Sequence, residues 1–158
     1  MANTQAMATS FLGELLTGTH NFGVAPIRAA STADSFKAAL YLVSATINAA
    51  TTVYTVTGEV TGTNYTAGGV AVTNATVPAA TNSSATAGVA YWTPSGSITY
   101  TSVTLATAFD TVLIYNSTQG SKAVSVHTFG SQTITAGTFT LTMPTNNTTT
   151  ALLRLATT

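Results

Sequence analysis

The sequence predicts an all-β protein, an antiparallel β-sandwich of the jelly-roll or immunoglobulin-like kind, with a short helix or arm at its N-terminus. Two observations support this fold class. Segments rich in Val, Ile, Tyr, Phe and Thr recur along the chain, and turn-forming residues separate them at intervals of about 8 to 14 residues, as in sandwiches and barrels. Thr and Ala make up about two fifths of the chain, and β-branched Thr suits a half-buried pleated surface.

Residues 1–19 differ from the rest, and we expect them to form a helix or arm in front of a single β-domain of residues 20–158. Ser10 is the predicted N-cap, unless the helix begins earlier at Thr4, and Gly18 is the predicted stop. The helix packs either on its own domain or on a neighbouring subunit, and the sequence leaves both interpretations open. The apolar residues that recur at helical steps are Met7, Phe11, Leu12, Leu15 and Leu16.

The next part of the chain predicts a loop and then a buried strand. Residues 20–35 contain Gly23, Pro26 and many small side chains, which favours a loop. The segment 36–43 is apolar over most of its length, as a strand buried on both faces requires. Small residues at 44–52 form the connection that follows it.

The middle of the chain carries weaker signals. Residues 53–57 alternate weakly and predict a strand, whereas 58–65 holds two glycines and predicts a turn or an irregular crossing. The glycine pair 68–69 precedes a short strand at 70–72. Residues 73–88 are compatible with a weak strand or an exposed loop.

The second half of the chain predicts the most regular strands. Polar turns are expected at 116–121 and at 136–137, since both contain a glycine. Pro144 and the polar residues after it should close the domain. The predicted strands contain residues 91–92, 98–105, 112–115, 123–129 and 138–143, and a last short one contains Leu152, Leu153 and Leu155.

The charge content of the chain is unusually low. Only 5% of the residues are charged, and four Lys and Arg balance four Asp and Glu, whereas about a quarter of a soluble domain is ordinarily charged. This argues against a nucleic-acid binder, which needs clustered cations, and against a polybasic membrane-surface protein. A neutral chain with many small apolar side chains should associate readily, so we expect it to work within an assembly.

Catalytic and metal-binding signals are weak, and we expect no enzyme activity and no cofactor. The chain has no cysteine, which excludes disulfides and thiolate chemistry. Its two histidines, His20 and His127, would each need a serine and one of two acids, Asp34 or Asp110, to form a catalytic triad. Neither a nucleophile-elbow motif nor a metal-binding motif is present.

Two further groups of residues are predicted to be structural. A buried or half-buried ion pair between Lys37 and Glu59 would fix the register of the strand at 36–43 more than it would add stability. The aromatic side chains lie mostly in predicted strands and should pack in the core. The alternative for the aromatic residues is a carbohydrate-binding platform that includes Trp92.

Several segments together resemble a widespread family of small virion structural proteins of tailed bacteriophages. The resemblance covers nearly the whole chain. It rests on FLGELLTGTHNF at 11–22, FKAALY at 36–41, TTVY at 51–54 and GEVTGTNYTAGG at 58–69, with LIYN at 113–116, TFG at 128–130 and GTFTL at 137–141 in the second half.

The resemblance implies a capsid cement (decoration) protein, synthesised in the host cytoplasm and located on the capsid surface of the virion. Its partners would be the major capsid protein and other copies of itself, as a homotrimer, with no nucleic acid and no membrane. A neck, tail or baseplate component of the same virion is the first alternative, and a host-glycan-binding module is the second. The candidate inter-subunit contacts are Phe11, Leu12, Leu15, Leu16, Leu152, Leu153 and Leu155.

Overall fold

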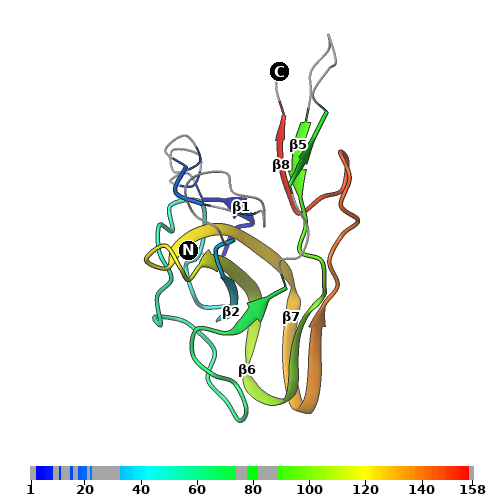
Figure 1. The fold of residues 1–158 in the computed structure, drawn as a ribbon. Coiled ribbons are helices and arrows are strands. Elements are labelled where there is room, and N and C mark those ends of the chain that lie inside the picture. Colours follow the sequence, from blue (N-terminus) through cyan, green and yellow to red (C-terminus); the bar gives the residue numbers. More distant parts are fainter. Residues whose placement is uncertain are drawn as a thin grey trace.

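A computed structural model describes residues 3–8, 11, 15, 18–20, 22, 33–73, 78–81 and 89–156. The strands of this part form a five-stranded sheet in the order β1-β7-β6-β2-β3 and a three-stranded sheet in the order β4-β5-β8, both antiparallel (Figure 1). The predicted β-sandwich is therefore confirmed. The strands are β1 (Ala6–Met7), β2 (Phe36–Leu42), β3 (Val70–Val72), β4 (Ala79–Ala80), β5 (Val89–Trp92), β6 (Ile98–Asn116), β7 (Lys122–Leu141) and β8 (Leu153–Ala156).

Two long strands, β6 and β7, dominate the larger sheet. They contain 19 and 20 residues, where the sequence predicted four shorter strands. The predicted turn at 136–137 is wrong, because these residues lie inside β7. The pairing of β6 with β7 shifts register at several points, and Ser102 and Ala136 have positive φ angles of 53° and 46°. Such bulges bend a strand without ending it, and both strands curve strongly in Figure 1.

The predicted turn at 116–121 is confirmed as the connection between β6 and β7. Gly120 and Ser121 have positive φ angles of 64° and 58°. The side-chain oxygen of Asn116 accepts hydrogen bonds from the backbone N–H groups of Thr118 and Gln119, at 3.1 and 3.0 Å. This Asx-type arrangement fixes the start of the turn.

The predicted buried strand is β2, which lies between β6 and β3. Residues 38–41 of β2 are completely buried, since the larger sheet is covered on both faces at this point. The glycine pair 68–69 directly precedes β3, as predicted. A side chain on Gly69, whose φ is +70°, would collide with the backbone carbonyl of Ala38, so only glycine allows β3 to approach β2.

The strand predicted at 53–57 is wrong. This segment contributes only an isolated bridge between Val53 and Lys122, and the residues on either side of it lie in loops and turns. The irregular crossing predicted at 58–65 is confirmed, with single bridges from Glu59 to Tyr41 and from Thr63 to Thr104. The weak alternation of polar and apolar residues at 53–57 therefore did not indicate a strand. Hydrogen bonds from tyrosine hydroxyl groups, described below, fix this connection instead of a strand ladder.

Aromatic side chains join the two sheets. Phe22 stacks on Phe36 of β2 with ring centroids 4.6 Å apart, and it meets Trp92 of β5 edge-on at 4.8 Å. The smaller sheet is thereby fastened to the larger one at the lower end of β5. Above this contact in Figure 1, β5 and β8 project beyond the larger sheet, toward the C-terminus.

The N-terminal segment is partly described. Residues 6 and 7 form β1, paired with β7, so a helix does not begin at Thr4 and Met7 does not belong to it. Phe11 and Leu15 have helical backbone, but Ser10, Leu12 and Leu16 lie outside the described residues. Gly18 has a φ of 64° and its N–H bonds to the carbonyl of Leu15 at 3.1 Å, as expected of a residue that ends a helix. Within the described part, no helix is long and apolar enough to cross a membrane.

Candidate functional site

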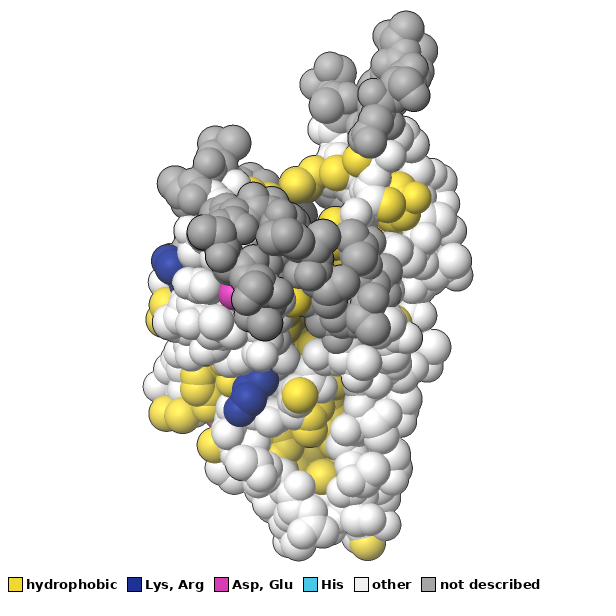
Figure 2. Space-filling model, in the orientation of Figure 1, with side chains coloured by type: hydrophobic (Ala, Val, Ile, Leu, Met, Phe, Trp, Pro, Cys, Tyr) yellow, Lys and Arg dark blue, Asp and Glu magenta, His cyan; other side chains and the backbone are white. Residues whose placement is uncertain are grey.

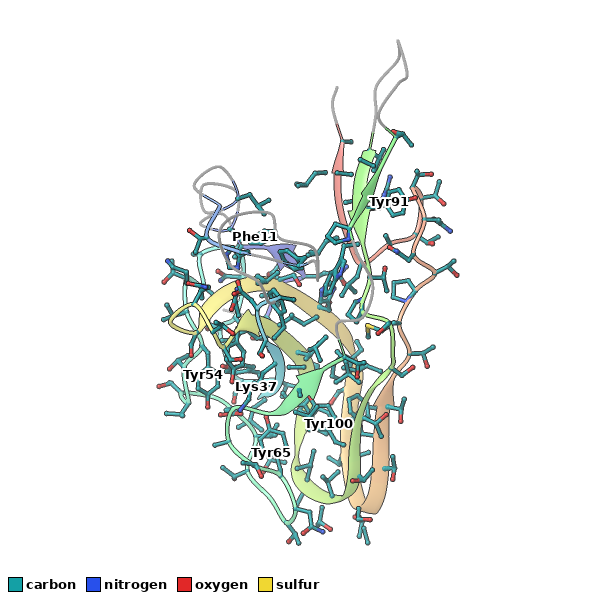
Figure 3. The ribbon with its side chains drawn as sticks, in the orientation of Figure 1. Phe11, Lys37, Tyr54, Tyr65, Tyr91 and Tyr100 are labelled. Carbon is teal, nitrogen blue, oxygen red and sulfur yellow. The ribbon has the colours of Figure 1, made fainter. Side chains whose placement is uncertain are left out.

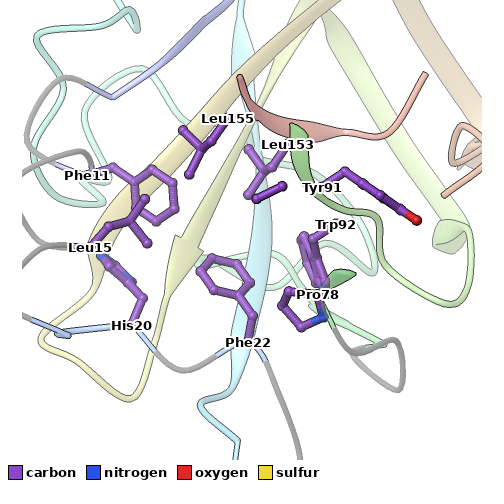
Figure 4. A pocket seen from close by; sticks show the side chains of 10 residues that line it. Phe11, Leu15, His20, Phe22, Pro78, Tyr91, Trp92, Leu153 and Leu155 are labelled. Atoms are coloured by element: carbon purple, nitrogen blue, oxygen red, sulfur yellow. The ribbon is translucent and has the colours of Figure 1, made fainter. Parts of the chain in front are cut away.

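An apolar pocket lies between the N-terminal segment and the smaller sheet (Figure 4). Its volume is about 200 Å³, and it is partly open to solvent. Apart from His20, its lining side chains are aliphatic or aromatic, and none carries a formal charge. The residues that line it are Phe11, Leu15, His20, Phe22, Pro78, Ala90, Tyr91, Trp92, Leu153 and Leu155.

Local strand geometry explains how β8 contributes to the pocket. Leu153 and Leu155 are two residues apart, so their side chains lie on the same face of β8. The pairing of β8 with β5 sets Leu153 opposite Trp92. Leu153 is buried, whereas Leu155 is 39% exposed at the rim. The strand therefore supplies both the inner wall of the pocket and an apolar edge that water still reaches.

The N-terminal side of the pocket is built by ring contacts. Phe11 is only 2% exposed, and its ring meets His20 edge-on at 4.9 Å and Phe22 edge-on at 5.8 Å. Edge-to-face pairs at these distances stabilise a fixed arrangement. Phe11 thus packs within its own chain, and a neighbour would reach it only through the open side of the pocket.

The structure brings together four of the predicted contact residues, which come from the two ends of the chain. Phe11 and Leu15 line the pocket on one side, and Leu153 and Leu155 line it on the other. Leu152 instead lines a separate cleft between β1, β7 and β8. Their hydrophobic pattern made these residues candidates, but no sequence signal indicated that the two ends meet. Sequence reasoning missed Phe22, Pro78, Ala90 and Tyr91, and did not connect Trp92 with the others.

A buried polar network lies beside this pocket. The side-chain amide nitrogen of Asn116 bonds to Nδ1 of His20 at 3.0 Å and to Oδ2 of Asp34 at 2.8 Å. Gln119 donates to the other Asp34 oxygen at 3.1 Å. Because the Asn116 oxygen already accepts two backbone N–H groups, its nitrogen must donate to His20, whose Nδ1 is therefore unprotonated. The network links the residues before β2 to the β6–β7 turn.

The two acids considered for a catalytic triad have other partners. The carboxylate of Asp34 accepts hydrogen bonds from the side chains of Asn116 and Gln119, as described above. Asp110 accepts hydrogen bonds from Asn3 at 2.8 Å and from Thr111 at 2.7 Å, and so does not orient His127. Within the described ranges, no group of three or more His, Asp or Glu side chains could hold a metal ion.

His127 and Ser125 form a hydrogen-bonded pair on β7. Nε2 of His127 lies 2.9 Å from the hydroxyl of Ser125, and both residues line the cleft of about 310 Å³ that Leu152 borders. Burial lowers the pKa of His127 to about 4, because a low-dielectric environment disfavours the imidazolium ion. Ser125 is buried and His127 is half-buried, so their hydrogen bond links two side chains on the same face of β7.

The predicted ion pair between Lys37 and Glu59 is wrong. Glu59 is 6% exposed, and its carboxylate accepts hydrogen bonds from the hydroxyl of Tyr54 at 2.6 Å, the hydroxyl of Tyr65 at 2.7 Å and the N–H of Gly68 at 2.8 Å. Neutral donors therefore satisfy this carboxylate in place of the ammonium group.

The tyrosine hydroxyls extend this network across the larger sheet (Figure 3). Tyr100 donates to the carbonyl of Ala38 at 2.7 Å, and Tyr115 donates to the carbonyl of Gly68 at 2.8 Å. Burial is the main cause that raises the pKa of both hydroxyl groups above the ordinary value, and the nearby Glu59 charge adds to it. These hydroxyls thus remain protonated donors that fix loops to the sheet.

The carbohydrate platform that included Trp92 is not formed. Trp92 is 3% exposed, because it packs between the two sheets. A platform for sugar stacking needs an accessible ring face, which this tryptophan does not offer.

The chain was compared with known proteins at three levels. No protein-family model, no curated protein and no solved structure matches it. The interpretation of the pocket therefore depends on its own residues and geometry.

Proposed function

We propose that this chain is a structural virion protein, a capsid cement (decoration) protein that binds the outer shell and bridges capsomers. The apolar pocket is the observation that carries the proposal. It gathers predicted contact residues from both ends of the chain, leaves Leu155 at 39% exposure on its rim, and lacks charged lining residues. An open pocket with an apolar lining is a surface on which another molecule can be bound.

The distribution of charge supports an assembly role. Glu59 and Asp34 are buried and occupied by hydrogen bonds within the chain. Figure 2 shows a face that is mainly uncharged, with few Lys, Arg, Asp or Glu side chains among its described atoms. Such a surface can be buried against neighbouring subunits without the cost of removing charges from water.

The edge of the smaller sheet also supports this proposal. In the described part of the chain, β8 pairs with β5 alone, so the other edge of β8 has no strand partner there. Arg154 is the one charged residue of β8. Its Nε donates a hydrogen bond to the carbonyl of Thr148 at 2.8 Å, so this side chain is bound to its own chain. Exposed strand edges are places where another chain adds by backbone hydrogen bonding.

The number of copies per particle tests the proposed role. Quantitative mass spectrometry of purified virions should give a ratio to the major capsid protein near one to one. A few copies per particle would contradict the cement function and would favour the neck, tail or baseplate.

A second measurement separates shell binding from mere abundance. Purified protein should bind to shells that lack it and should raise the temperature at which those shells release their contents. A Leu155→Asp variant should bind more weakly, whereas Thr135→Asp, at an exposed position of β7, is the matched control. Equal binding by both variants would show that the pocket is not the contact.

A further inference from the structure

Two clefts adjoin each other between the larger sheet and the segment that leads from β7 to β8 (Figure 1). The first is the cleft of about 310 Å³ beside Ser125, and we call it the polar cleft. The second, which we call the apolar cleft, has a volume of about 220 Å³. Gln5, His127 and Leu152 line both of them, so the two clefts meet at these three side chains.

The apolar cleft is built on one face of the larger sheet. Val112 and Ile114 are two residues apart on β6, so their side chains lie on the same face of the strand. Val112 is paired with His127 of β7. Both β6 residues are buried, whereas Leu141 and Met143, which also line the cleft, are half-buried. The cleft therefore has an apolar floor that belongs to the core and apolar sides that water still reaches.

The polar cleft contains a cation. Among the described residues that line either cleft, Arg154 is the only one with a formal charge. It precedes Leu155 in β8, so its side chain lies on the opposite face of the strand from that of Leu155. Its Nε uses one N–H group to bond to the carbonyl of Thr148. The terminal nitrogens carry the other four donors, in a planar fork that matches a carboxylate.

The other polar groups of the polar cleft are neutral. His127 is uncharged at neutral pH, because burial lowers its pKa to about 4, and its Nε2 lies 2.9 Å from the hydroxyl of Ser125. Gln5 contributes a side-chain amide. No Asp or Glu occurs among the described lining residues of the two clefts. One positive charge among neutral hydrogen-bonding groups favours a ligand group with a single negative charge.

We infer that the two clefts together bind an aliphatic carboxylate, with its carboxylate at Arg154 in the polar cleft and its hydrocarbon chain in the apolar cleft. Arginine holds a carboxylate by two parallel charge-assisted hydrogen bonds. The apolar cleft, at about 220 Å³, exceeds a cavity of about 150 Å³ that accepts benzene, so it has room for a chain of about six to eight carbon atoms. Apolar walls with a few placed polar groups are typical of small-molecule sites.

This site goes beyond the proposed cement function and does not depend on it. The apolar pocket proposed to contact the shell includes Leu155, whereas Arg154 lies on the other face of β8. A bound chain would fill the space between the larger sheet and the segment before β8. Because such a ligand binds the folded chain, it should also raise the melting temperature.

Isothermal titration calorimetry of the full chain with octanoate, kept below the concentration at which it forms micelles, tests the inference. Octanoate should bind saturably, at one molecule per chain. It should bind at least about tenfold more tightly than octanol, which lacks the charge, and than acetate, which lacks the chain. The absence of saturable octanoate binding, or equal affinities for octanoate and octanol, would overturn the inference.

A charge variant tests the role of Arg154. Arg154→Gln should weaken octanoate binding by at least about tenfold and leave the affinity for octanol unchanged. Arg154 is exposed, so the variant should fold, and its melting temperature without ligand checks this. Lys37→Gln removes the same charge at a residue of β2 and should bind octanoate as the wild type does. Wild-type octanoate affinity in Arg154→Gln would contradict the assignment of the carboxylate.

Methionine-methyl NMR locates the hydrocarbon chain. Octanoate should shift the methyl signal of Met143, which is identified by its loss in a Met143→Leu variant. Leu155→Asn, at the rim of the apolar pocket, should bind octanoate with wild-type affinity. If octanoate left the Met143 signal in place, or if Leu155→Asn lost the binding, the ligand would lie in the apolar pocket and the inference would be wrong.

Discussion

The carboxylate of Glu59 is stabilised by hydroxyl and amide donors rather than by a cation. We expect Glu59→Gln to lower the free energy of unfolding by about 1–3 kcal/mol, because hydrogen bonds to a charged group are strong and a buried donor left unpaired is costly. The donors concerned are Tyr54, Tyr65 and Gly68. Urea denaturation of both proteins measures the difference.

Lys37→Met is the matched control for Glu59. Lys37 is half-buried on β2 and forms no ion pair with Glu59, and methionine keeps a long apolar stem at this position. This change should therefore alter the free energy of unfolding by less than about 0.5 kcal/mol. If Lys37→Met lowered the free energy of unfolding as much as Glu59→Gln does, the ion pair predicted from the sequence would be the main interaction of the Glu59 carboxylate after all.

His127 should make the stability of the fold depend on pH. Burial lowers its pKa from 6.5 to about 4, so between these values the unfolded chain binds a proton that the folded chain does not. The part of the free energy of unfolding that depends on a neutral His127 is fully present above about pH 6.5 and is lost as the pH falls toward 4. It amounts to at most about 3 kcal/mol.

A His127→Gln variant isolates this effect from the titration of the acids. Glutamine keeps a polar partner for Ser125 but does not titrate. The difference in free energy of unfolding between wild type and variant should therefore shrink as the pH is lowered from 7 to 4.5, when both are followed by urea denaturation. A constant difference across this range would refute the assignment.

At the scale of the element, Gly69 determines how β3 meets β2. Gly69→Ala should destabilise the protein by several kcal/mol, because its Cβ would collide with the backbone of Ala38 and its φ of +70° disfavours any side chain. Gly130→Ala is the control, since its surroundings are open. Melting temperatures of the two variants compare the positions, and a Gly69→Ala protein as stable as Gly130→Ala would contradict this account of the β2–β3 approach.

The elements also show what the sequence could predict. The buried strand β2 and the turn after Asn116 were predictable because their signals, continuous apolar residues and a Gly-containing polar segment, are local. The lengths of β6 and β7 were not predictable, because a residue such as Ala136 gives the same sequence signal in a turn and in a β-bulge. Pairing with the neighbouring strand determines which of the two forms.

The candidate site was predictable in part for the same reason. The apolar character of Phe11 and Leu155 can be recognised in the sequence, but their meeting depends on the tertiary fold. The Glu59 network was mistaken for an ion pair because a lysine lay on a neighbouring predicted element, whereas tyrosine hydroxyls give no comparable charge signal. Long-range pairing is the information that a single sequence lacks.

At the scale of the whole molecule, the low charge content should govern how the assembly responds to salt. The chain has zero formal net charge and only 5% charged residues, and the contact surfaces proposed above are apolar. Salt weakens interactions between exposed charges by screening them, but it leaves apolar burial largely unaffected. The self-association constant, measured by analytical ultracentrifugation, should therefore change by less than about threefold between about 0.05 and 0.5 M NaCl. Dissociation at the higher of these concentrations would place charged groups in the contact and would contradict an assembly that is held together by apolar surfaces.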